Sequence, residues 1–337
     1  MTSPLETLSQ ALFPWLAPAL EQFETARRAG NLGHAWLISG PAGIGKINLA
    51  LVLARRLLGA AAEPVELDAA AALAAIAERH APMDRHPDLH WLHPDEDKES
   101  ISVDQVRALT EAFTLTAHGG GAKIAIVEPA EAMTTAAANA LLKTLEEPTA
   151  GSYLLLLSHQ PGRLPATVRS RCQHLTLRAP ITASVAKWLG VAPQVVAQAQ
   201  RMVGPAPLRL AAAIQEDDLS VFRKLESDLT AVCQDQLEPQ TVSQAWAKGD
   251  LELALSWLRR RLLEELRLRS MATPGSTEVT VPEGATLHNA WRSVPVRTLF
   301  EQYDRAEKLL NQLGSGVNIE LALQAMLHAL VVNRGRS

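Results

Sequence analysis

Apolar residues in the first half of the chain form short continuous runs that alternate with runs at helical spacing. The continuous runs predict β-strands, because near-continuous apolarity is typical of strands buried on both faces of a parallel sheet. They cover residues 34–39, 89–93, 123–128, 153–158 and 173–177. The helical pattern covers residues 45–58, 67–80, 102–118 and 134–147. This alternation predicts a three-layer α/β domain.

Local signals define the ends of two of these helices. Ser102, followed three residues later by Gln105, predicts a capping box at the start of the third helix. The glycines of the segment 119–123 are expected to end that helix, because glycine tolerates left-handed dihedrals. Pro148 is expected to stop the fourth helix, since proline cannot continue one.

After residue 180 the apolar residues follow helical spacing with almost no strand signal. Residues 181–215 predict short helices, and the remainder predicts longer ones joined by an exposed loop at residues 272–284. The pattern therefore predicts three domains. They are an α/β domain over residues 1–178, a small helical domain over residues 179–215 and a larger helical domain over residues 216–337.

The composition is that of an ordinary globular protein, with 337 residues, 47% hydrophobic and 20% charged, and a net charge of −4. No overall basic field indicates nucleic acid. Two cysteines, Cys172 and Cys233, exclude a disulfide framework and a four-cysteine zinc site. The first twenty residues lack the basic start of a secretion signal, and no run of eighteen apolar residues predicts a membrane span. We expect a cytoplasmic protein.

The segment 40–46 has the pattern of a phosphate-binding loop, with Gly40, Gly43, Gly45 and Lys46 between a predicted strand and a predicted helix. Such glycines turn backbone N–H groups towards phosphate at a helix N-terminus, and the lysine reaches the β and γ phosphates. The next position needs a hydroxyl to ligate Mg²⁺, but it holds Ile47. Asn48 comes one place too late, so its side chain points elsewhere on the helix.

The strand over residues 123–128 should end in an Asp-Glu pair that assists the metal and polarises water. Glu128 holds the first position and Pro129 the second. Proline has no base to activate water, so this role is unfilled unless the Glu131 carboxylate, in the following turn, extends to the same position. We predict no hydrolysis. Weak nucleotide binding without turnover, a vestigial loop and an ordinary glycine turn all stay open as alternatives.

Four segments carry a specific resemblance: "HAWLISGPAGIGK", "AAANALLKTLEEP", "LLLLSHQP" and "LPATVRSRCQHL". In this order and spacing they resemble the bacterial DNA polymerase III clamp-loader subunits, which are AAA+ proteins. Together with "GVNIELALQAML" near the end, the resemblance covers nearly the whole chain, more weakly after residue 215. It implies an α/β P-loop, RecA-like domain followed by a small helical lid and an all-α collar.

That family contains ATPase subunits and a non-hydrolysing type, delta′, and the changes at Ile47 and Pro129 are similar to delta′. The resemblance implies a subunit of a DNA-directed DNA polymerase complex that requires no cofactor. Its implied partners are ATPase subunits of the gamma or tau type, the delta subunit, the sliding clamp and, through the complex, primed DNA. No membrane partner is implied.

In this family the arginine of the Ser170-Arg171-Cys172 motif contacts ATP held by the adjacent ATPase subunit. Physically this is an arginine finger, a charged fork that stabilises transition-state charge at the γ-phosphate. Arg169 is an alternative finger. Without the resemblance, a surface salt bridge is the better interpretation of Arg171. Cys172 is expected to be a small buried residue.

Many relatives carry four cysteines between the loop helix and the second strand, forming a zinc module that this sequence lacks. We expect no metal there. The conceivable replacement ligands are His80, Asp84, His86, Asp88, His90 and His93. Ser158 lies at the place of a γ-phosphate sensor, although capping of the strand end is the preferred interpretation. Arg209 lies near the place of a second sensor, although a solvated or interface arginine is preferred.

Two other functions are compatible with parts of the sequence. A working AAA+ motor would use Lys46, Glu128 and Glu131. A small-molecule P-loop kinase would use the same loop, but the Ser-Arg-Cys motif and the helical C-terminal third, with no evident acceptor pocket, argue against it. Any contact with DNA is expected to be modest and electrostatic.

Overall fold

The computed structural model falls into two compact units. One comprises Met1–Ala197 and Pro205–Ala212, and the other comprises Gln198–Gly204 and Ala213–Ser337. The described residues are 10–59, 63–77, 86–95, 98–115, 117, 121–215, 219–271, 286–310, 312–313 and 318–331. None of the helices in these ranges combines the length and apolarity needed to cross a bilayer.

The first unit is built on a parallel five-stranded sheet in the order β4-β5-β6-β2-β7. All five predicted strands are confirmed. They are β2 (Ala35–Ser39), β4 (Leu89–Leu92), β5 (Lys123–Val127), β6 (Ser152–Ser158) and β7 (Gln173–Thr176). β2 lies between β6 and β7, so the strand order reverses where the glycine loop follows it. In open α/β sheets, ligand sites lie beyond the carboxyl ends of the strands at such a point.

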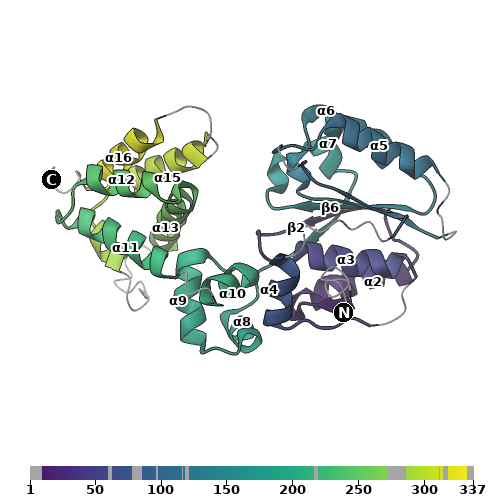
Figure 1. Ribbon diagram of the computed structural model, residues 1–337, viewed down its shortest axis with the longest axis horizontal. Coiled ribbons are helices and arrows are strands. Elements are labelled where there is room, and N and C mark those ends of the chain that lie inside the picture. The colour runs from purple at the N-terminus through teal and green to yellow at the C-terminus, as the bar shows by residue number, and fades with distance from the viewer. Residues whose placement is uncertain are drawn as a thin grey trace. The chain divides into compact units, whose positions relative to one another are not determined.

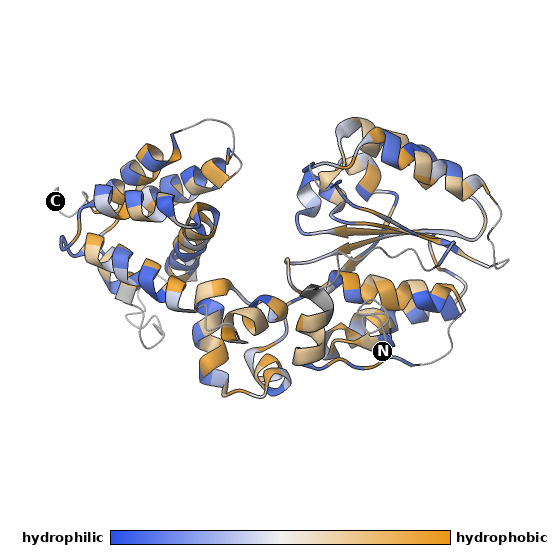
Figure 2. Cartoon of the chain, in the orientation of Figure 1, coloured by the Kyte–Doolittle hydropathy of each residue, from blue (hydrophilic) through white to orange (hydrophobic). Residues whose placement is uncertain are grey.

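Helices cover both faces of this sheet (Figure 1), which confirms the three-layer prediction. One face carries α2 (Ala17–Arg28) and α3 (Lys46–Leu57), and the other carries α5 (Val103–Thr114), α6 (Thr135–Glu146) and α7 (Ala166–Arg169). Successive strand residues point to opposite faces: Ile38 packs with the first set and Leu37 with the second. The strands are hydrophobic over most of their length (Figure 2), so the sheet supplies the core of both layers.

The prediction that every strand is buried on both faces is wrong for the two edge strands. β2 and β5 are buried throughout and β6 nearly so, whereas β4 is half-buried and most of β7 is exposed. An edge strand has a neighbour on one side only, so less of it is covered. In "QHLTL", residues 173–177, Leu175 and Leu177 therefore pack in the core, while the other three residues are exposed.

Helix α5 confirms its predicted start but not its predicted end. The Ser102 hydroxyl accepts a hydrogen bond from the Gln105 backbone, and the Gln105 side chain accepts one from Ser102 N, which completes the capping box. The helix ends at Thr114 rather than residue 118, because Leu115 takes an extended conformation. The expected glycine stop was therefore placed too late, and residues 118–120 lie outside the described part. Helix α6 ends two residues before Pro148, in agreement with the prediction.

Several short elements complete the first unit. The small parallel pair of β1 (Ala11–Leu12) and β3 (Val65–Glu66) was not predicted. The others are η1 (Pro14–Leu16), α4 (Ala69–Ala77), η2 (Ala130–Ala132), η3 (Pro161–Arg163), α8 (Thr182–Leu189) and α10 (Pro207–Gln215). α4 lies within its predicted range, whose last residues, 78–80, lie outside the described part. α9 (Pro193–Val203) and α10 flank the predicted turn at residues 204–207.

The described part of the second unit is all-helical, which confirms the prediction for the C-terminal third. Its helices are α11 (Leu219–Cys233), α12 (Pro239–Lys248), α13 (Leu251–Met271), α14 (Thr286–Trp291), α15 (Val296–Leu310) and α16 (Ile319–Ala329). Trp246 and Trp257 meet edge to face in its core, with ring centroids 5.9 Å apart. The loop predicted at residues 272–284 lies outside the described part.

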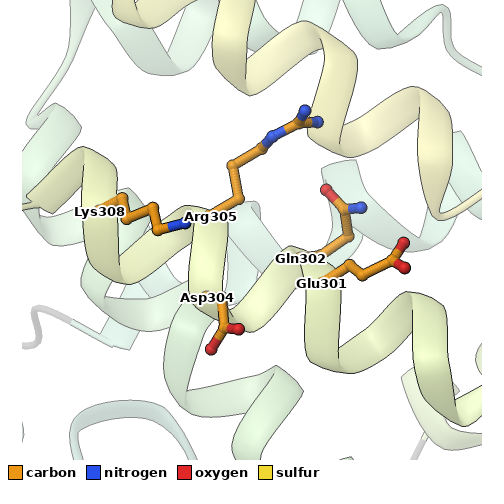
Figure 3. A pocket seen from close by; sticks show the side chains of 5 residues that line it. All are labelled: Glu301, Gln302, Asp304, Arg305 and Lys308. Carbon is orange, nitrogen blue, oxygen red and sulfur yellow. The ribbon is translucent and has the colours of Figure 1, made fainter.

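A surface hollow of about 450 Å³ lies along α15 in the second unit (Figure 3). It is lined by Glu301, Gln302, Asp304, Arg305 and Lys308. Two acidic and two basic side chains among these residues cancel in charge. The hollow therefore has no preference for phosphate, and the candidate site for the predicted chemistry lies in the first unit.

Candidate functional site

The glycine loop joins β2 to α3 in the first unit, as predicted. Gly43 and Gly45 have φ of 81° and 96°, in the left-handed region that favours glycine. A Cβ added to Gly45 would lie 2.6 Å from the ring of Phe13. The loop therefore needs glycine both for its dihedrals and for the close approach of the N-terminal segment.

Lys46 is turned back onto this loop. Its side chain is buried, and Nζ donates hydrogen bonds to the carbonyl oxygens of Gly40 at 2.8 Å and Pro41 at 3.0 Å. Burial lowers the pKa of Lys46 from its ordinary 10.5 to about 8, although Glu128 and Glu131 act in the opposite direction. The group that would bind phosphate is thus bonded to carbonyls of its own loop.

The lowered pKa of Lys46 predicts a stability that rises with pH. Between pH 8 and 10.5 the unfolded chain keeps the Lys46 proton while the folded chain loses it, so deprotonation favours the folded state. Relative to Lys46→Met, the free energy of unfolding of the wild type should rise by up to about 1.4 kcal/mol per pH unit in this window. Urea unfolding at several pH values measures the difference, and parallel pH curves for the two proteins would contradict it.

The two residues after Lys46 face the protein interior. Ile47 is 5% exposed and packs in the hydrophobic core between the sheet and α3. Asn48 is fully buried, and its amide accepts a hydrogen bond from Phe13 N and donates one to Ala11 O. This confirms that Asn48 points elsewhere. An apolar group stands where Mg²⁺ needs an oxygen ligand, so these residues do not fit a catalytic metal.

An aromatic cluster of Phe13, Trp15 and Trp188 lies against the loop. Phe13 stacks on Trp15 with ring centroids 4.9 Å apart, and Trp188 of α8 meets both rings edge to face. The Trp15 indole donates a hydrogen bond to the Ile44 carbonyl at 2.8 Å. This cluster was not predicted, because Trp188 is 175 residues from Phe13. The nearest signal was the dense aromatic "FPW" motif.

The segment predicted as a lid also contacts the loop. Leu208 N, in α10, donates a hydrogen bond to the Gly43 carbonyl at 3.1 Å. The stem of Arg209 lies beside Gly43, and the Arg209 charge acts to lower the pKa of Lys46. Arg209 is therefore beside the loop, at the place expected for a second sensor, and the loop is held by the chain on two sides.

The residues expected beyond β5 and β6 form a local network. Glu128 is close enough to Lys46 to influence its pKa. Glu131, in η2, uses one carboxylate oxygen to accept hydrogen bonds from the backbone of His159 and Gln160 at 2.9 and 3.0 Å. Ser158 is buried and accepts a bond from Gln160 N at the strand end, which agrees with the preferred capping interpretation. Glu131 thus supports the loop after β6.

The described residues contain no group of three metal-ligating side chains. Of the six conceivable replacement ligands, the structure describes four: His86, Asp88, His90 and His93. The other two, His80 and Asp84, lie outside the described part. His90 lies in β4, and burial lowers its pKa.

The Ser170-Arg171-Cys172 motif directly follows α7. Arg171 is 35% exposed in its side chain, and its guanidinium pairs with Glu146 at 2.6 Å. The salt bridge that a family-free interpretation favours is therefore present. Ser170 is exposed, and its hydroxyl donates to the Thr167 carbonyl. Cys172 is buried, as expected, and burial raises the pKa of its thiol to about 12, so it is no nucleophile. Arg171 is the member of the motif that can reach an external anion.

Comparison with known proteins decides the family. A family model described as "DNA polymerase III, delta subunit" matches residues 16–180. DNA polymerase III subunit delta′ of Pseudomonas aeruginosa PAO1 is 36% identical over 255 residues, which cover 73% of this chain and 74% of the relative. The chain belongs to the delta′ family. The resemblance found in the sequence is thereby confirmed, and the structure confirms the expectation of an α/β domain followed by helical parts.

Another member of the delta′ family matches a shorter stretch. The protein of Escherichia coli K12 is 38% identical over 177 residues, 52% of each chain. Among solved structures, a gamma subunit-related protein of Thermotoga maritima has a TM-score of 0.38 at 20% identity and covers 92% of this chain and 98% of its own. The RuvB branch migration motor of the same organism has a TM-score of 0.40 at 15% identity and covers 92% of each. These two TM-scores are too low to carry an inference.

Proposed function

We propose that this chain is a non-hydrolysing delta′ subunit of the clamp loader in DNA polymerase III. In this role it assembles with ATPase subunits of the gamma or tau type and with the delta subunit, and it helps to load the sliding clamp on primed DNA. The proposal implies a cytoplasmic location, because bacterial chromosomes are replicated in the cytoplasm. The three-part division into α/β domain (1–178), lid (179–215) and collar (216–337) belongs to this proposal.

The observation that carries the proposal is the state of the loop. Lys46 is bonded to two loop carbonyls, and the adjacent Ile47 is buried in the core. Hydrolysis needs a cation at position 46 that contacts the β and γ phosphates, and an oxygen ligand for Mg²⁺ at position 47. Pro129 further leaves the water-activating place without a base. These features support a subunit that consumes no ATP, while weak nucleotide binding stays compatible with the remaining glycines.

The second half of the proposed function is a trans-acting arginine. Arg171 is part of the motif that in this family contacts a neighbour's ATP, and its guanidinium lies at the surface. Arg169, the alternative, is less exposed, and its Nε is buried without a hydrogen-bond partner. A side chain constrained in this way is less able to extend across an interface, so we assign the role to Arg171.

The purified chain is expected to show no steady ATP turnover with Mg²⁺. Ile47→Thr is expected to leave it inactive, because a hydroxyl beside Lys46 does not supply the base that Pro129 lacks. ATP turnover by the wild type and by Ile47→Thr is measured as the release of phosphate, with Lys46→Ala as the control for contaminating ATPases. Turnover by the wild type that Lys46→Ala abolishes would contradict the non-hydrolysing role.

A further inference from the structure

The guanidinium of Arg171 is held at two points. One terminal nitrogen donates to the Thr167 carbonyl at 2.9 Å, and the other lies 2.6 Å from a carboxylate oxygen of Glu146. Thr167 lies in α7, one turn before Arg171, whereas Glu146 is the last residue of α6. Two elements therefore fix the direction of the side chain, although it is 35% exposed.

The Arg171–Glu146 ion pair involves one particular arginine of a basic segment. The segment 148–215 contains seven lysine and arginine residues and no aspartate or glutamate. Across the described ranges, Arg163, Arg169 and Arg178 of this segment form no ion pair with a carboxylate. A glutamate outside the segment thus contacts the one arginine to which the family motif points.

Glu146 does not stabilise the helix in which it lies. The C-terminal end of a helix carries partial negative charge, so a carboxylate in the last turn is unfavourable. The pair is also half-exposed, with Glu146 49% exposed, and surface pairs of this kind add little to stability. Neither effect explains the contact, whereas orientation of Arg171 does.

Resting on the proposed trans role of Arg171, we propose that Glu146 is the positioning residue for the arginine finger. An arginine side chain loses considerable rotamer freedom when it is fixed, and the Glu146 and Thr167 contacts fix it before a neighbour's nucleotide arrives. Arginine has five N–H donors, and these contacts leave the others free. The remaining donors can then bond the γ-phosphate of the adjacent subunit without release of Glu146.

The test compares Glu146→Gln with Glu147→Gln in the reconstituted complex with its ATPase subunits, clamp and primed DNA. Glu147 is the adjacent, exposed carboxylate and forms no ion pair within the described ranges, so it is a matched control. Glu146→Gln should lower the kcat of ATP turnover at the adjacent site about two- to five-fold with KM unchanged, the size expected from one exposed ion pair. Glu147→Gln should match the wild type.

Arg171→Ala and the double variant Glu146→Gln/Arg171→Ala complete the test. Once Arg171 is removed, Glu146→Gln should have no further effect, whereas a merely structural glutamate would still lower the rate. The thermal midpoints of the isolated variants should stay close to that of the wild type.

The outcomes separate the two proposals. A loss with Arg171→Ala but none with Glu146→Gln would overturn the positioning role alone. A faster rate with Glu146→Gln would also overturn it, because the carboxylate would then compete with phosphate for the guanidinium. No loss with Arg171→Ala would overturn the trans role itself.

Discussion

Arg171→Ala is expected to lower ATP hydrolysis at the neighbouring subunit's site by about 10³-fold, the lower end of what arginine fingers contribute in well-studied GTPases. The guanidinium stabilises negative charge that develops on the γ-phosphate, and alanine offers no charge in its place. Single-turnover hydrolysis by the reconstituted complex, stimulated by clamp and primed DNA, measures this effect. Steady-state rates of the whole complex would fall by less, because Arg171→Ala leaves the other ATPase sites unchanged.

Arg178→Ala is the control for a general effect of surface charge. Arg178 is exposed, follows the edge strand β7 and belongs to the same acid-free segment, but it has no carboxylate partner among the described residues. Its replacement should leave the single-turnover rate of ATP hydrolysis at the neighbouring site unchanged. If Arg171→Ala behaved as Arg178→Ala does, the specific role of Arg171 would be lost. Equal large losses in both variants would instead indicate a broad electrostatic contact between subunits.

The sequence predicted the features of the site that depend on local order. The glycine loop, the unsuitable Ile47 and the inward-facing Asn48 all follow from neighbouring positions on one strand-loop-helix unit. The sequence could not predict that Lys46 bonds the carbonyls of Gly40 and Pro41, because the same residues can bind a phosphate when the lysine is extended. The choice between these states depends on what packs around the loop.

Contacts between residues far apart in the chain were missed for the same reason. Glu146 and Arg171 are 25 residues apart, and they meet because α6 and α7 cover the same face of the sheet. Apolar periodicity identifies α6 but does not show which of its polar residues faces α7. The edge positions of β4 and β7 are likewise a property of strand order, which the composition of each strand does not encode.

The aromatic cluster links the N-terminal segment and the glycine loop to α8, and this packing bears on the proposed function. Phe13 contacts Trp15, Trp188 and the loop at Gly45, while its backbone bonds Asn48. A subunit that does not cycle through nucleotide states needs no opening of the loop. Close packing of the N-terminal segment against the loop is compatible with that requirement, and it makes Phe13 a central residue of the first unit.

Phe13→Ala is therefore expected to lower the free energy of unfolding of the first unit by about 3–5 kcal/mol, the usual cost of truncating a fully buried aromatic ring. Denaturant unfolding followed by tryptophan fluorescence is the measurement, since Trp15 and Trp188 both touch the deleted ring. Phe300→Ala makes the same change at a side chain that is 55% exposed, in the second unit, and should cost about 0.5 kcal/mol or less. Equal losses in the two variants would mean that the cluster does not hold the loop. A large loss for Phe13→Ala alone, with hydrolysis still absent, would show that the cluster serves stability and that its packing is not what prevents hydrolysis.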